Sequence, residues 1–98
     1  MYKELFVTDD LENISEEIVF EELSKIIDDG ELEFSETAIT VQDIVAIALN
    51  KMPPKYICSF VEKKYPRETL RLEIMEMKKL AHIELIKAIE KVNANPHE

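Results

Sequence analysis

One stretch decides the fold that we expect for this chain: Asp43-Ile44-Val45-Ala46-Ile47-Ala48-Leu49-Asn50-Lys51-Met52-Pro53-Pro54-Lys55-Tyr56. Its apolar spacing predicts a helix, and the two prolines must end that helix because neither donates a backbone hydrogen bond. The residue before a proline is also pushed away from helical angles. We therefore expect a buried helix that ends in a rigid corner.

The corner gathers four polar side chains at the helix C-terminus, where cations are favoured: Asn50, Lys51, Lys55 and Tyr56. Two interpretations stay open. Paired prolines are an ordinary way to end a helix, so the segment can be a structural corner, which we favour on physical grounds alone. The alternative is a ligand site that uses these polar groups.

The composition indicates one small globular domain. The chain has 98 residues, 46% of them hydrophobic and 34% charged, which suits a packed core rather than disorder. Its single cysteine, Cys58, excludes an internal disulfide and favours a reducing cytoplasm. The sequence shows neither a secretory signal nor an apolar run long enough to span a membrane. We therefore expect a soluble cytoplasmic protein.

Charge is divided unevenly along the chain. Residues 1–50 carry 14 acidic and 2 basic side chains, whereas residues 51–98 carry 7 acidic and 10 basic ones. The overall net charge of −9 argues against a nucleic-acid polymer as partner. The positive charge of residues 51–98 is compatible with a small local anion site. Alternatively, the two halves attract each other within the fold or across a dimer.

Apolar periodicity predicts two further helices around the central one. The first begins near Thr8 to Asp10 and ends at the only glycine, Gly30. In the connection 31–39, Leu32 and Phe34 tuck inward, and Thr40 caps a second helix that runs from about Val41 to Lys51.

Residues 55–65 are predicted to be extended or a short helix, and no sheet is expected because no second strand is apparent. Pro66 then opens a third helix, which continues to about Val92. Its apolar arc is too wide for one short partner to cover, so we expect it to dimerise.

The chain shows little catalytic or metal chemistry. A single glycine excludes a P-loop, a Gly-rich dinucleotide turn and a nucleophile elbow, so we expect no enzyme. His82, His97 and Cys58 do not have the spacing of a metal set.

Cations and aromatic rings that could bind an anion form one cluster. The predicted ligand site therefore consists of six residues: Asn50, Lys51, Lys55, Tyr56, Arg67 and Arg71.

Three segments in this order resemble one known family: residues 11–23, the Asp43–Tyr56 stretch with its Ala-Leu-Asn-x-x-Pro-Pro-x-Tyr piece, and residues 87–96. Together they are similar to the late competence protein ComFB family. The resemblance covers a helical domain at 11–96, after an N-terminal extension at 1–10. It implies an all-α, dimeric cytoplasmic protein associated with bacterial competence or regulation. Some members are similar to cyclic-dinucleotide receptors in activity.

The resemblance has one departure. Many members carry Cys-x-Cys-x-x-Cys before the second helix and hold zinc there, but this chain has Ser35, Thr37 and Thr40 at those positions. Neutral hydroxyls bind zinc far more weakly than thiolates do, so we expect no metal cofactor. Packing of Leu32, Phe34 and Ile39 and the Thr40 cap are expected to hold the connection instead.

Two function hypotheses follow. The first is a noncatalytic, dimeric regulatory module that binds a cyclic dinucleotide or a similar anionic signal at the six-residue site. The second is a competence-associated protein-interaction adaptor without a small ligand, whose acidic first helix docks on a basic partner through Glu16, Glu17 and Glu21.

Overall fold

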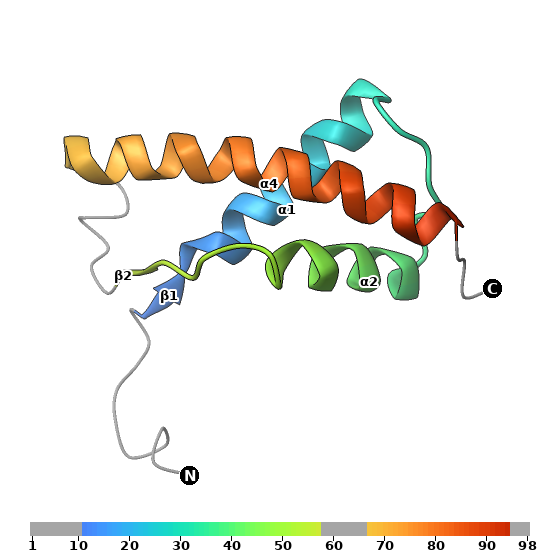
Figure 1. Cartoon of the computed structure of the whole chain (residues 1–98), viewed down its shortest axis with the longest axis horizontal. Helices are drawn as coiled ribbons and strands as arrows, with labels where there is room; N and C mark the ends of the chain where they lie inside the picture. Colours follow the sequence, from blue (N-terminus) through green and yellow to red (C-terminus); the bar gives the residue numbers. More distant parts are fainter. Residues whose placement is uncertain (1–10, 58–66, 95–98) are drawn as a thin grey trace, which may run out of the picture.

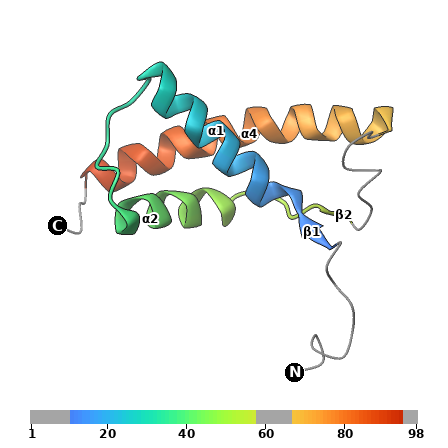
Figure 2. The same ribbon diagram turned by 180° about the vertical axis from the view of Figure 1, so that it is seen from behind.

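The fold is mainly helical, as predicted. The computed structural model describes residues 11–57 and 67–94, and among them lie three helices and one pair of short strands. In chain order these are β1 (Glu12–Asn13), α1 (Ile14–Asp29), α2 (Ala38–Leu49), β2 (Tyr56–Ile57) and α4 (Glu68–Ala94). The long helix α4 runs along the molecule, while α1 and α2 pack against it and against each other (Figure 1, Figure 2).

The core lies between the three helices. Ile26, Ile44, Leu85 and Ile89 are its largest fully buried aliphatic side chains. Ala48, Ala81 and Ala88 are also fully buried, and such small side chains let the helices approach closely. Among the described residues, the buried face of α4 consists of Leu70, Met77, Ala81, Leu85, Ala88, Ile89 and Val92.

Helix α1 begins later than the sequence suggested. The prediction of a start near Thr8 to Asp10 is wrong, because Glu12 and Asn13 form β1 and α1 begins at Ile14. Asn13 is the N-cap, and its side-chain oxygen accepts a hydrogen bond from the Ser15 amide at 3.2 Å. The predicted end is confirmed: Gly30 has φ 64°, a left-handed conformation that glycine adopts without strain.

The proline corner is held by the start of α1. Helix α2 ends at Leu49, with Asn50 as its C-cap. Beyond the corner, β2 pairs with β1 in antiparallel register, Glu12 opposite Ile57 and Asn13 opposite Tyr56. The prediction that no sheet forms is therefore wrong. These strands have two residues each, too short to give a periodic pattern in the sequence.

Helix α2 begins one turn earlier than predicted. Thr37, not Thr40, is its N-cap, and the Thr37 hydroxyl oxygen accepts a hydrogen bond from the Thr40 amide at 3.2 Å. The hydroxyl of Thr37 in turn donates to that of Thr40 at 3.0 Å. Asp43 consequently lies inside the helix, six residues after the cap.

The connection between α1 and α2 is tied to α4. Leu32 and Phe34 pack against the core as predicted, but Ile39 is 65% exposed and does not. Polar contacts hold the connection instead of Ile39. The side-chain amide of Asn93 donates to the Glu33 carbonyl at 2.9 Å. His82 Nε2 lies 3.1 Å from a Glu31 carboxylate oxygen.

Some predictions concern residues outside the described ranges. These are the N-terminal extension at 1–10, the conformation of 58–65, the opening of the third helix at Pro66 and the roles of Cys58 and His97. None of the described helices is both long enough and apolar enough to cross a membrane.

Candidate ligand pocket at the proline corner

A surface pocket of about 410 Å³ lies between the proline corner and the first turns of α4. This volume is in the range of small-ligand sites. Its walls come from separate segments of the chain: Leu11, Lys55, Tyr56 and Ile57 on one side, and Arg67, Thr69, Leu70 and Glu73 on the other.

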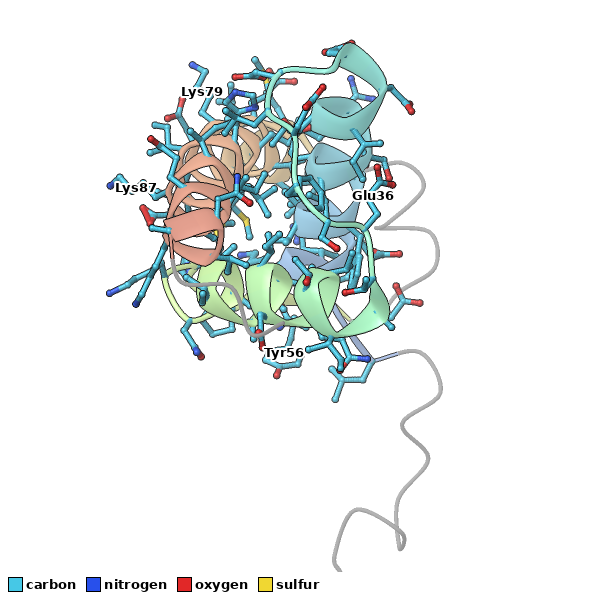
Figure 3. All side chains as sticks on the ribbon, turned by 90° about the vertical axis from the view of Figure 1, so that its right-hand side faces the viewer. Glu36, Tyr56, Lys79 and Lys87 are labelled. Atoms are coloured by element: carbon cyan, nitrogen blue, oxygen red, sulfur yellow. The ribbon has the colours of Figure 1, made fainter. Side chains whose placement is uncertain are left out.

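The pocket brings together half of the predicted ligand site. Lys55, Tyr56 and Arg67 all line it. Tyr56 is 60% exposed and lies on the outside of the molecule, so its ring offers an accessible stacking surface (Figure 3). Lys55 and Arg67 supply two cations from segments that are 12 residues apart in the sequence.

The other three predicted residues lie elsewhere. Asn50 is the C-cap of α2, and its backbone amide donates to the Ala46 carbonyl at 3.0 Å. Lys51 follows in an exposed turn. Arg71 is one helical turn from Arg67, as the spacing predicted, but it is not among the residues that line the pocket.

Lys55 is positioned through both its backbone and its side chain. Its amide donates to Asn13 Oδ1 at 3.1 Å, and its carbonyl accepts from the Ile14 amide at 2.8 Å. Its ammonium nitrogen lies 2.8 Å from a Glu73 carboxylate oxygen. Asn13 and Glu73 were therefore missed as site residues, since no local spacing links either of them to the corner.

Ser15 is a second anchor of the corner. Its hydroxyl donates to the Pro53 carbonyl at 2.6 Å, and the residue is 1% exposed. Ser15 is therefore part of the packed corner and not a surface hydroxyl. A buried hydroxyl needs a hydrogen-bond partner. Here the partner is the Pro53 carbonyl, which lies beyond the end of α2.

The lining of the pocket combines positive and negative charge. Lys55 and Arg67 line it together with Glu73, whose carboxylate pairs with Lys55. Thr69 and Leu70 belong to the first turn of α4, where free amides and the helix dipole also favour negative charge. A phosphate placed near Arg67 would compete with Glu73 for Lys55.

Thr37 and Thr40, two of the three residues that stand where the resembled family carries cysteines, belong to the α2 cap. Thr37 and Thr40 hydrogen-bond to each other, as described above. Within residues 11–57 and 67–94, no three histidine, cysteine or acidic side chains gather as a metal set.

The family model described as late competence development protein ComFB matches residues 12–96 of the chain. The chain belongs to the ComFB family. No curated protein and no solved structure matches it. The match includes every described helix and strand and the whole pocket except Leu11.

Membership in the ComFB family gives the chain a competence-related, regulatory setting, and ComFB is not a family of known enzymes. The matched region contains the Asn13–Lys55 hydrogen bond, the Ser15–Pro53 hydrogen bond and the Lys55–Glu73 ion pair. The proline corner of this ComFB protein is therefore held in place by side chains from the start of α1 and from α4.

Proposed function

We propose that this ComFB protein is a noncatalytic cytoplasmic regulatory module that binds a cyclic dinucleotide, or a similar small anion, in the pocket at the proline corner. The observation that carries the proposal is the convergence of Lys55, Tyr56 and Arg67 on one pocket. Cyclic dinucleotides combine phosphates with flat bases, and the pocket offers cations beside an exposed aromatic ring.

Glu73 is expected to compete with a bound phosphate for Lys55. The Glu73 carboxylate holds the Lys55 ammonium at 2.8 Å. An arriving phosphate has to share or replace this pair, and the Glu73 charge repels it. Both side chains are partly exposed, with 36% and 43% of their surfaces accessible, so water screens the pair and a ligand can break it.

Calorimetry with cyclic dinucleotides tests the pocket. We expect the double variant Lys55→Ala plus Arg67→Ala to weaken binding at least tenfold, because two charge-assisted contacts are lost. Glu73→Gln should bind more tightly than the parent chain, because the amide no longer repels phosphate or neutralises Lys55.

Lys87→Ala plus Lys91→Ala is the matched control, since it removes the same number of charges near the opposite end of α4 from the pocket. Equal weakening of binding in the control would mean that the net charge of the chain, and not the pocket residues, determines the affinity. Absence of heat with the parent chain at high micromolar ligand would refute the proposal.

The adaptor hypothesis is the second candidate, and one surface favours it. Phe20 is 50% exposed on α1, among the exposed Glu16, Glu17 and Glu21. Glu22 is not part of this acidic face, because it is nearly buried and pairs with Lys25 at 3.0 Å. That hydrogen bond and the Glu22 charge raise the pKa of Lys25 above its ordinary value.

A salt-dependent pull-down separates the adaptor from the ligand module. Reversing Glu16, Glu17 and Glu21 to lysine should abolish capture of a basic partner at low salt and leave nucleotide binding unchanged. A partner captured equally well by the reversed chain, or equally well at high salt, would count against docking through α1.

We also propose that the ComFB chain forms a homodimer through α4. The support is the apolar surface that α4 leaves outside the core: Leu72, Met75 and Ile83 are each at least half exposed. A monomer rarely exposes three large apolar side chains on one helix without a use for them. Sedimentation of the purified chain measures the subunit number.

A further inference from the structure

An open groove of about 540 Å³ adjoins the ligand pocket, between the proline corner and α4. Pro53 and Pro54 line it from the corner, and Leu72 and Met77 line it from α4, so the surface inside it is mainly apolar. The groove shares three lining residues with the ligand pocket: Lys55, Thr69 and Glu73. A molecule in one of the two sites therefore lies next to the other site.

The groove is lined by three carboxylates, those of Glu68, Glu73 and Glu76. Among the described residues that line it, Lys55 is the only cation. Glu76 lies 3.5 Å from Lys79, but both side chains are well exposed, so water screens this pair. The net negative charge repels nucleic acids and anionic lipid surfaces, and it attracts lysine and arginine side chains.

One ion pair belongs to both sites. The Glu73 carboxylate lies 2.8 Å from the Lys55 ammonium, and each residue lines the pocket as well as the groove. While this pair holds, Lys55 offsets one of the negative charges in the groove. A phosphate in the pocket attracts Lys55 away from Glu73. The carboxylate is then available to a cation in the groove.

We infer that the groove docks a basic segment of a partner protein that also carries apolar side chains, and that ligand binding in the pocket strengthens this docking through Glu73. The inference rests on the proposed function and gives the signal a receiver. Apolar side chains of the segment pack on Pro53, Pro54 and Leu72, while its lysines or arginines pair with the carboxylates. This surface is separate from the α1 face of the adaptor hypothesis.

Fluorescence anisotropy with a short labelled peptide of alternating leucine and lysine tests the groove. Glu68→Lys plus Glu76→Lys should weaken peptide binding about tenfold or more, because two attractive charges become repulsive. Glu16→Lys plus Glu90→Lys is the matched control, since both glutamates are exposed and neither lines the groove. At physiological salt the control should change binding by no more than about twofold. Equal weakening in both variants would overturn the inference.

A second pair of variants tests the apolar contact. Leu72 and Ile83 are exposed on α4 to similar extents, 54% and 50%, but only Leu72 lines the groove. Leu72→Gln should weaken peptide binding about threefold or more, whereas Ile83→Gln should leave it unchanged. Equal effects would contradict docking in the groove. Conversion of a dimer to monomers by the peptide would show that a second copy fills the groove, and would also overturn the inference.

Lys55→Ala tests the coupling without any nucleotide. It leaves Glu73 without its lysine, so it should tighten peptide binding about threefold, the scale of a partly exposed ion pair. Lys87→Ala removes one exposed lysine far along α4 and is the control, with an expected change well below that of Lys55→Ala. Saturating cyclic dinucleotide should tighten peptide binding to the parent chain by a similar factor, but not to Glu73→Gln.

The two proposals fail in different ways. Peptide binding that neither Lys55→Ala nor bound nucleotide changes would overturn the inference, and the ligand pocket would stand. Absence of heat with nucleotide would instead refute the proposed function, while tighter peptide binding by Lys55→Ala would still support docking in the groove through Glu73.

Discussion

Replacing Leu85 by alanine is expected to lower the free energy of unfolding by about 3–5 kcal/mol, the largest effect among the changes considered. Leu85 is fully buried in the middle of α4, and α4 packs against both α1 and α2. The smaller side chain leaves a cavity that three packed helices cannot close. For a domain of this size the whole stability is about 5–15 kcal/mol, so the variant should lose a substantial part of it.

Urea unfolding followed by circular dichroism measures this change. Ile39→Ala is the matched control, because it also truncates a helical aliphatic side chain, but one that is 65% exposed. The control should change the free energy of unfolding by no more than about 0.5 kcal/mol. Similar losses in the two variants would mean that Leu85 does not lie at the centre of the core.

Replacing Asn13 by alanine is expected to lower the free energy of unfolding by about 2–4 kcal/mol. The side-chain oxygen of Asn13 accepts from the amides of Ser15 and Lys55 at the same time. Losing the helix cap costs about 0.5–2 kcal/mol. Leaving the Lys55 amide without its acceptor adds about 1–3 kcal/mol. Because Lys55 lines the pocket, the variant should also bind anions more weakly.

Asn13→Asp separates the hydrogen bonds from the bulk of the residue. Aspartate keeps an acceptor at the same place, and its charge suits the helix N-terminus, so it should restore most of the stability. Asn93→Ala removes one exposed hydrogen bond, to the Glu33 carbonyl, and should cost about 1 kcal/mol or less. A loss in Asn13→Ala no larger than in Asn93→Ala would contradict the double role of Asn13.

Local sequence rules predicted the parts of the fold that depend on neighbouring residues. The buried seam of α4, the end of α1 at Gly30 and the break at Pro53 and Pro54 follow from helical periodicity, left-handed glycine and the missing amides of proline. Helix starts were predicted less well, because several residues can serve as a cap. Thr37 and Thr40 are both good N-caps, and the structure uses the first.

The candidate pocket was predicted only in part. The composition of the corner pointed to Lys55, Tyr56 and Arg67, which do line one pocket. It could not point to Glu73 or Asn13, since the contacts of Lys55 with these residues span 18 and 42 positions of the chain. Arg71 lies one turn after Arg67, but it does not line the pocket.

The sequence by itself determined that this chain is a small, mainly helical ComFB protein with a proline-ended central helix. Those features come from backbone chemistry and from the spacing of apolar side chains, which act over a few residues. Only the tertiary structure decided that Glu12–Asn13 pairs with Tyr56–Ile57 and that Glu73 holds Lys55 at the pocket. Such contacts form between distant segments, and packing of the three helices brings those segments together.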